Sequence, residues 1–170
     1  MTTTFHLRVW TRYNEPIGRV WEVKTDPKRL SDEFPCGMGL KVDDPSALSD
    51  TLANGGTCRM DARFGIAGIS WPVHITEVEP GRRFRDVSEN ALFSRYEHEH
   101  IFEETPDGAR YIDAVTFTPK FPAPKLAAIL TKNFFVRRHR AVAKILDADK
   151  RTVGTNVLRV LLEELPKESE

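Results

Sequence analysis

The chain has 170 residues, of which 40% are hydrophobic and 29% are charged. This length and composition indicate one globular domain rather than two. The 25 basic residues balance the 25 acidic residues, so no overall charge favours nucleic acid or a membrane surface as a partner.

The sequence predicts a cytoplasmic protein without a transmembrane segment, as a monomer or a homodimer. No run approaches the ~20 apolar residues of a membrane-spanning helix. Residues 1–5 lack the charged and apolar regions of a secretory signal. Cys36 and Cys58 are the only cysteines. They are too few for a disulfide framework, and we interpret them as small apolar side chains in a reducing compartment.

The first third of the chain mixes one strand with short helices. Residues 4–10 alternate between apolar and polar side chains, as a strand does. Asn14, which closely precedes a proline, predicts the cap of a first helix, and a second short helix follows through Leu30. Residues 35–56 show no clear period, and we expect a loop there with a short strand around 39–43.

The middle of the chain predicts a meander of antiparallel strands that ends in one long helix. Turn residues separate the strands, notably Pro80-Gly81 and the four residues 105–108. The alternating segments are 57–64, 69–78, 83–88, 95–103 and 109–117. Residues 125–148 predict a helix of about 36 Å. Its apolar candidates are Leu126, Ile129, Leu130, Phe134, Val142, Ile145 and Leu146.

This order of elements predicts an α+β fold. A curved antiparallel sheet of about six or seven strands has two short helices after its first strand. One long C-terminal helix packs across it, because an apolar sheet face must be covered. We expect residues 1–150 to form a single domain. Residues 151–170 should add a short amphipathic helix and a frayed tail.

Several segments together resemble a known superfamily. They are Val20-Trp21-Glu22, Asp26-Pro27, residues 71–77, Phe84 with Asp86, the His-Glu-His strand at 96–102, and Asp113-Ala114-Val115. Over residues 3–148 the chain resembles the START/SRPBCC superfamily, which has the helix-grip fold of the birch pollen allergen. The subgroup most similar in appearance is the polyketide cyclase/dehydrase-like and coenzyme-Q-binding-like set.

The resemblance implies a deep cavity between sheet and helix for lipids, polyketides, quinones or other apolar molecules. Most members of the superfamily bind or carry such ligands, and a minority are enzymes. Catalytic residues are not shared across the superfamily, so the fold alone assigns no chemistry.

Four polar residues lie on strand faces that otherwise predict burial: Asp86, His98, His100 and Asp113. A hairpin loop between residues 104 and 109 would place His100 opposite Asp113, close enough for a hydrogen bond. The same register pairs Phe102 with Tyr111 and His98 with Val115. Asp86 should then lie near Tyr96 or His98.

The cluster has three interpretations that the sequence leaves open. It is a satisfied polar network that holds the sheet, a set of groups that orient a ligand, or a catalytic or metal-binding site. The catalytic candidates are His98, His100, Asp113 and Asp86. Nothing in the sequence marks an open coordination position, so we expect no metal and no cofactor.

The expected partner is a small hydrophobic or amphipathic molecule, which the chain binds or transports. Its contacts should be Trp71, Phe84, Asp86, Tyr96, His98, His100, Phe102, Tyr111, Asp113, Phe117, Phe134 and Arg137. The basic run 137–140 predicts a solvated helix face, with Arg137 or Arg138 meeting an acidic head group as the alternative. Two other functions remain open: a cyclase/dehydrase-like enzyme, and a protein-interaction module whose cavity is filled.

Overall fold

The structure is a computed structural model that describes residues 3–26, 28–34, 38–42, 52, 55–64, 67–147 and 157–165. Cys36 and most of the loop expected over 35–56 lie outside these residues, whereas Cys58 is buried. Within the described ranges, no helix has the length and apolar character needed to cross a membrane.

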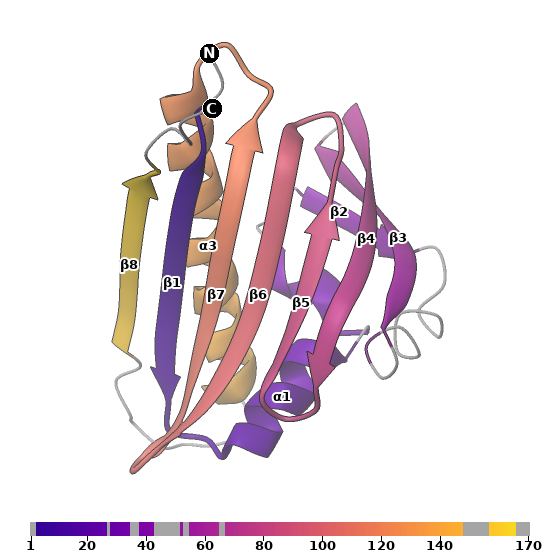
Figure 1. Cartoon of the computed structure of the whole chain (residues 1–170). Coiled ribbons are helices and arrows are strands. Elements are labelled where there is room, and N and C mark those ends of the chain that lie inside the picture. Colours follow the sequence, from indigo (N-terminus) through magenta and orange to yellow (C-terminus); the bar gives the residue numbers. More distant parts are fainter. Residues whose placement is uncertain are drawn as a thin grey trace.

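One curved antiparallel sheet of eight strands forms the body of the described structure (Figure 1). Neighbouring strands follow the order β2-β3-β4-β5-β6-β7-β1-β8. The strands are β1 (Phe5–Tyr13), β2 (Met38–Val42), β3 (Gly56–Phe64), β4 (Ala67–Glu79), β5 (Arg83–Ser88), β6 (Phe93–Thr105), β7 (Gly108–Pro119) and β8 (Val157–Glu164). All five strands predicted in the middle of the chain are present.

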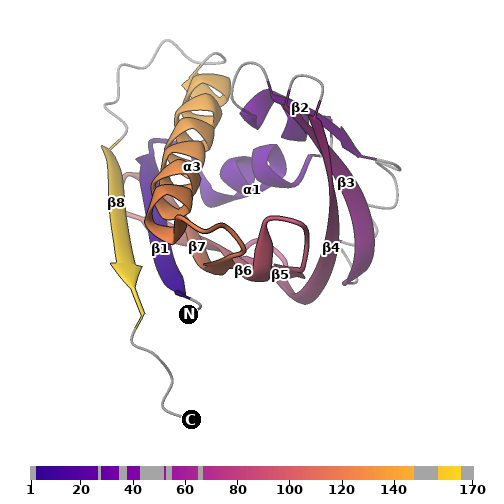
Figure 2. The same cartoon turned by 90° about the horizontal axis from the view of Figure 1, so that it is seen from above.

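Three helical segments lie on the concave side of the sheet. They are α1 (Ile17–Thr25), the 3₁₀ helix η1 (Leu30–Glu33) and the long α3 (Pro124–Asp147). Seen from above, the sheet curves round α1 and α3 (Figure 2). This arrangement confirms the predicted α+β helix-grip fold, with eight strands in place of the expected six or seven.

The central strands have the register that the turn residues predict. His100 lies opposite Asp113, and His98 lies opposite Val115. Asp86 of β5 lies opposite His98, one of its two expected neighbours. Side chains two positions apart on a strand point to the same face, so this register gathers the polar residues on the concave face.

The start of α1 differs from the prediction. The helix begins after Pro16, and no side chain caps it, so Asn14 is not its cap. Pro16 has φ −57° and ψ 147°, which is extended backbone. The residue before a proline is also restricted to extended conformations, so the helix begins only beyond the proline.

The C-terminal segment is a strand, which corrects the short helix expected within 151–170. β8 pairs with β1 over most of its length, for example Leu162 with Leu7. Without β8, β1 would expose a row of unpaired backbone N–H and C=O groups. The backbone hydrogen bonds that this segment makes to β1 favour a strand over the helix that the spacing of its leucines predicted.

The long helix buries Val142 and Leu146 as predicted, but its first half buries a different face from the one predicted. Leu126, Ile129 and Leu130 are exposed. The buried side chains of α3 are Ala127, Ala128, Phe135, Arg138, His139, Val142 and Leu146. Residues three and four positions apart share a helix face, so Arg138 and His139 follow Phe135 into the interior. The prediction of a solvated basic face was therefore wrong for these two residues.

We expect Gly108→Ala to lower the free energy of unfolding by at least about 2 kcal/mol. Gly108 has φ +143°, and an added Cβ would collide with the backbone oxygen of Tyr13 and the backbone nitrogen of Glu15. Gly18→Ala in α1 is the matched control, because an added Cβ there meets nothing within 4 Å. It should leave stability unchanged or raise it by up to ~1 kcal/mol. Urea unfolding measures both, and equal losses would contradict the expectation.

Candidate functional site

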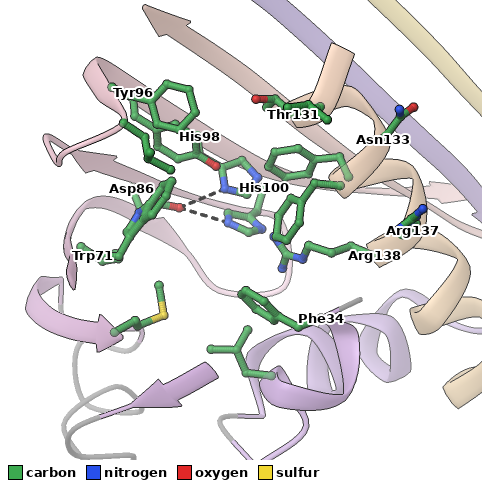
Figure 3. A pocket seen from close by; sticks show the side chains of 18 of the residues that line it. Phe34, Trp71, Asp86, Tyr96, His98, His100, Thr131, Asn133, Arg137 and Arg138 are labelled. Atoms are coloured by element: carbon green, nitrogen blue, oxygen red, sulfur yellow. Dashed lines mark hydrogen bonds and ion pairs between the residues drawn. The ribbon is translucent and has the colours of Figure 1, made fainter. Parts of the chain in front are cut away.

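A cavity of about 630 Å³ lies between the sheet and α3. Strands β4, β5 and β6 contribute its floor, α3 one wall, and η1 with the end of α1 the facing wall. Most lining side chains are apolar. The aromatic ones are Phe34, Trp71, Phe84, Phe93, Tyr96, Phe121, Phe134 and Phe135. Figure 3 shows Arg138 reaching from α3 into this space, whereas Arg137 stays beside its helix.

The cavity wall includes eight of the twelve expected ligand contacts: Trp71, Phe84, Asp86, Tyr96, His98, His100, Phe134 and Arg137. The other four are buried outside it: Phe102, Tyr111, Asp113 and Phe117. Phe102 and Tyr111 pack with Val142 and Leu146, whereas Phe117 packs with Phe135. All twelve expected contacts are on described elements, but the position of α3 decides which of them a ligand can reach.

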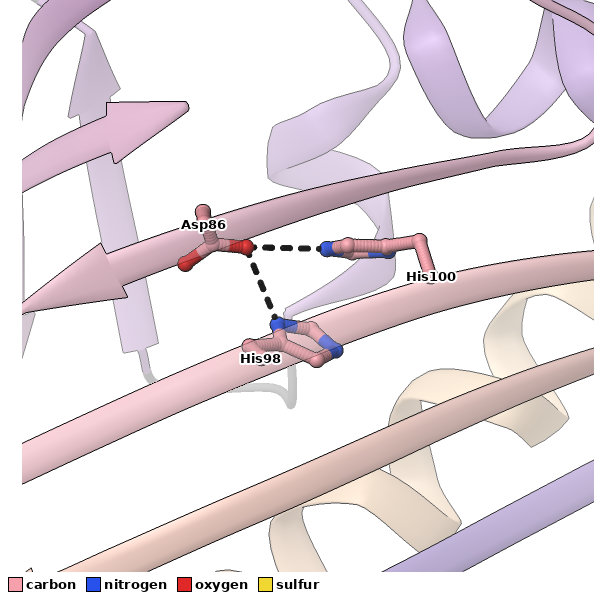
Figure 4. A group of neighbouring side chains, drawn as sticks. All are labelled: Asp86, His98 and His100. Carbon is pink, nitrogen blue, oxygen red and sulfur yellow. Dashed lines mark hydrogen bonds and ion pairs between the residues drawn. The ribbon is translucent and has the colours of Figure 1, made fainter. Parts of the chain in front are cut away.

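Three polar side chains meet on the cavity floor (Figure 4). Asp86 Oδ2 lies 3.1 Å from His100 Nε2 and 3.4 Å from His98 Nδ1. The two imidazole rings lie side by side with centroids 3.8 Å apart, and Phe84 stacks on His100 at 3.9 Å. Neighbouring strands β5 and β6 therefore hold one carboxylate and two imidazoles in fixed mutual positions.

Asp113 connects this floor to α3 and β1. Its Oδ1 accepts a hydrogen bond from His98 Nε2 at 2.9 Å, and its Oδ2 accepts one from His139 Nε2 at 3.1 Å. The Tyr111 hydroxyl also donates to Asp113. His139 Nδ1 lies 2.8 Å from the Thr11 hydroxyl. Residues of four different elements thus satisfy one buried carboxylate and its partner.

The expected hydrogen bond between His100 and Asp113 does not form. The two residues lie opposite each other, but His100 Nδ1 bonds to the Tyr111 hydroxyl at 2.6 Å and stays 3.4 Å from Asp113 Oδ1. His98 reaches Asp113 diagonally instead. The prediction was correct in register and wrong in partner, because ring orientation decides which neighbour is reached.

The surroundings give the histidines opposite protonation preferences. Burial by itself would lower the pKa of His98, but the Asp86 and Asp113 carboxylates outweigh burial and raise it. Burial, and then the charge on His98, lowers the pKa of His100 to about 3. Burial likewise lowers the pKa of His139, against the opposing effect of Asp113. His98 is therefore the histidine that holds a proton most readily.

Both carboxylates stay ionised in this setting. Burial would raise the pKa of Asp86, but His98 and His100 hold it below its usual range. The same holds for Asp113, whose pKa is lowered by His98 and His139 despite complete burial. The readily protonated His98 thus lies between two negative charges, that of Asp86 on the cavity floor and that of Asp113 buried behind it.

A second buried charged group lies on the facing wall. Glu33 Oε2 lies 2.5 Å from Lys24 Nζ and 2.8 Å from Arg138 Nη2. Glu33 Oε1 and Arg138 Nε are buried without a hydrogen-bond partner among the described residues. Burial, and then the charge on Arg138, lowers the pKa of Lys24. Lys24 and Arg138 both line the cavity, so two cations around one carboxylate leave this wall net positive.

No functional role was predicted for Lys24, Glu33 or His139 from the sequence. One signal was available for Lys24, which follows Val20 at helical spacing. Arg138 and His139 similarly follow Phe135 by three and four positions. Glu33 had no such signal, because its partners come from two other segments of the chain.

Asp86, His98 and His100 also form a group of metal-ligating type. Within the part of the chain that the structure describes, one ligand atom of each lies within 4.8 Å of the others. Imidazole nitrogens with a carboxylate oxygen suit first-row transition metals. The residues that could hold a metal are therefore the same ones that form the cavity floor.

Comparison with known proteins shows a family and a fold. The model of a family described as "Domain of unknown function (DUF8410)" matches residues 12–146. A search among curated proteins found no match. Solved structures do match, and protein CV1439 from Chromobacterium violaceum is 16% identical with a TM-score of 0.67, over 84% of this chain and 97% of that one.

Two other solved structures indicate the same fold. The AHSA1 (SPO3351) protein from Silicibacter pomeroyi is 15% identical with a TM-score of 0.64, over 85% of this chain and 99% of that one. DynU16, a protein of the dynemicin biosynthetic locus, is 19% identical with a TM-score of 0.63, over 85% of this chain and 48% of that one. At such identities the likeness shows the fold alone, and that fold is the helix-grip fold that the sequence predicted.

We expect Asp113→Asn to lower the free energy of unfolding by about 3 kcal/mol, because two buried histidines lose their carboxylate partner. Glu99→Gln is the control. Glu99 lies on the other face of β6, partly exposed, and pairs with Arg83 at 3.4 Å, so its loss should be below about 1 kcal/mol. Urea unfolding of both variants measures the difference. Equal effects would show that the strand faces are assigned wrongly.

Stability should depend on pH through two histidines in two separate ranges. His100, with its pKa lowered to about 3, stays neutral in the folded protein but takes up a proton on unfolding below about pH 6.5. Stability is therefore lost as pH falls from 6.5 towards 3, and His100→Gln should reduce this loss. His98, with its raised pKa, contributes fully below pH 6.5. That contribution is lost as pH rises through the raised pKa, and His98→Gln should remove the loss.

Urea unfolding at intervals between about pH 4 and pH 9 measures both effects. His74→Gln, at an exposed histidine of β4, serves as the control for a histidine substitution outside the site. Profiles in which His98→Gln and His100→Gln change the same pH range would contradict the assigned protonation states.

Proposed function

The chain belongs to the DUF8410 family, whose description names no activity, and we propose that it binds one small hydrophobic or amphipathic molecule between the sheet and α3. The observation that carries this proposal is the cavity of about 630 Å³. Small-molecule sites commonly have volumes of about 300–1,000 Å³ and apolar walls with a few placed polar groups. Protein interiors are otherwise closely packed, so a ligand accounts for a space of this size better than a filled interior does.

The walls favour a flat, unsaturated ligand body. Trp71 meets Phe93 and Tyr96 at centroid distances of 5.8 and 5.0 Å, and Phe34 meets Phe134 at 5.4 Å on the other side. Aromatic rings pack well against the edges and faces of further rings. A quinone or polyketide-like molecule therefore suits the cavity better than a saturated lipid. The likeness to DynU16, named for a biosynthetic locus, is consistent with this preference.

Polar groups on both walls favour a ligand with oxygen atoms. Tyr96 lines the cavity, and burial raises its pKa well above the usual value, so its hydroxyl remains a donor. Arg138, which reaches into the cavity from α3, keeps its charge, and its Nε has no hydrogen-bond partner among the described residues. Carbonyl, hydroxyl or carboxylate oxygens on the ligand would meet these donors. We assign this function to residues 1–150, since every lining residue lies between Lys24 and Arg138.

An enzyme of the cyclase or dehydrase kind is the second candidate, favoured by one observation. His98 and His100 reach the cavity with Asp86 beside them. A histidine oriented by a carboxylate can remove a proton from a carbon next to a carbonyl group. An enzyme would release an altered molecule, whereas a binding protein would return its ligand unchanged.

The test is native mass spectrometry of the purified chain, followed by organic extraction and identification of what it carries. We expect a mass excess of one small molecule per chain that disappears on denaturation. The naphthalene dye 1-anilinonaphthalene-8-sulfonate serves as a probe of the emptied cavity and should bind at one saturable site. If the protein carries no small molecule and the dye does not saturate, the proposal is wrong. Recovery of a chemically changed molecule after incubation favours the enzyme.

Two variants distinguish dye binding in the cavity from dye binding on the surface. Ala127→Trp should fill the cavity from α3 and weaken dye binding at least about tenfold, since Ala127 lines it. Ala141→Trp, on the same helix but outside the cavity lining, should leave the affinity for the dye unchanged. Similar dye affinities in the two variants would place the binding site elsewhere.

A further inference from the structure

We propose that Asp86, His98 and His100 bind one divalent transition-metal ion, such as Zn²⁺, on the cavity floor. The ion would have three protein ligands and at least one coordination position open to the cavity. This inference goes beyond the proposed function and does not depend on it, because the site is built from protein groups alone. It also revises the sequence-based expectation of no metal, which was based on the lack of any sign of an open coordination position.

The separations of the ligand atoms fit a tetrahedral ion. Bonds of about 2.0–2.1 Å to nitrogen and oxygen place adjacent tetrahedral ligands roughly 3.3 Å apart. Asp86 Oδ2 lies 3.1 Å from His100 Nε2 and 3.4 Å from His98 Nδ1. All three atoms lie within 4.8 Å of one another. Figure 4 shows both imidazole nitrogens directed at the same carboxylate oxygen.

The outward nitrogen of each histidine is held by a hydrogen-bond partner. His98 presents Nδ1 to Asp86, and its Nε2 bonds to Asp113 at 2.9 Å. His100 presents Nε2 to Asp86, and its Nδ1 bonds to the Tyr111 hydroxyl at 2.6 Å. Metal-bound histidines almost always have their second nitrogen fixed by such a partner, often a carboxylate. A simple polar network would satisfy the same atoms, but it does not require both rings to turn one nitrogen to the same carboxylate oxygen, as they do here.

The open position and the local charge also fit a metal. All three residues line the cavity, so a bound ion would face the ligand space rather than closed protein. The carboxylate of Asp86 on this floor, and that of Asp113 buried behind His98 at 2.9 Å from its Nε2, would offset a double positive charge. Mixed imidazole and carboxylate ligands suit Zn²⁺, Fe²⁺ or Co²⁺, whereas Mg²⁺ and Ca²⁺ prefer oxygen ligands alone.

The experiment uses the full chain without an affinity tag, stripped with a chelator and dialysed. Calorimetric titration with Zn²⁺ alone should give one ion per chain. Co²⁺ in place of Zn²⁺ should give the visible absorption of a four-coordinate ion with nitrogen and oxygen ligands. Asp86→Asn and His100→Gln should each weaken Zn²⁺ binding at least about 100-fold, and Tyr111→Phe about tenfold, because it frees a ligand ring. His74→Gln, an exposed histidine of β4, should leave binding unchanged.

The proposal is overturned if the wild-type chain takes up neither Zn²⁺ nor Co²⁺, or if Asp86→Asn binds as the wild type does. Binding that is lost in His74→Gln would indicate a surface site and would overturn it too. Circular dichroism checks that each variant is folded. If a variant is not folded, the wild-type Co²⁺ spectrum alone decides whether the chain binds a metal ion at this site. An empty cavity in the ligand experiment would leave these outcomes unaffected, so failure of the two proposals can be told apart.

Discussion

The buried negative charge of Asp113 is the constraint on which the arrangement of the interior depends. Its side chain is 1% exposed, and an ionised carboxylate is costly to bury unless several donors surround it. Those donors come from β6, from β7 and from α3, as His98, Tyr111 and His139. The contact with His139 means that hydrogen bonds, in addition to apolar packing, specify where the long helix lies on the sheet. Networks of this kind stabilise one arrangement only when every member has its partner.

Two adjacent residues of α3 contact different parts of the fold. His139 bonds to the sheet through Asp113, while Arg138 pairs with Glu33 of η1. Lys24 completes the second group from α1. The helix is thus held between the sheet and the short helical segments, and the space beside this junction remains the cavity. Of the charged groups that hold the helix in place, Lys24 and Arg138 also line the cavity.

Local patterns were sufficient to predict strands β3 to β7, whereas the spacing of apolar residues did not show how the helices are placed on the sheet or that β8 belongs to it. The 105–108 turn and the alternation of β6 and β7 set the pairing of His100 with Asp113, because each depends on neighbouring residues only. The burial of Arg138 instead of Leu130 depends on Glu33, more than a hundred positions away. In the same way, β8 forms because β1 offers a free edge, which no property of the last residues reveals.

The hydrogen-bond partners within the site were harder to predict than its members. Asp86, His98, His100 and Asp113 could be placed together from strand faces. The choice of His98 rather than His100 as the partner of Asp113 depends on ring rotation. Helical spacing could indicate that Lys24 and Arg138 are buried, but not that both pair with Glu33, since the three residues lie on separate segments.

The mouth of the cavity has a thermodynamic consequence. Phe121, Leu126 and Leu130 line the cavity and yet are 49%, 56% and 61% exposed, so in the empty protein water covers apolar carbon there. A molecule that enters removes this surface from water, and loss of hydrated apolar surface lowers the heat capacity. The enthalpy of association therefore becomes more favourable as temperature rises. For the proposed ligand, these exposed side chains before and along α3 would thus set how the strength of binding varies between cold and warm conditions.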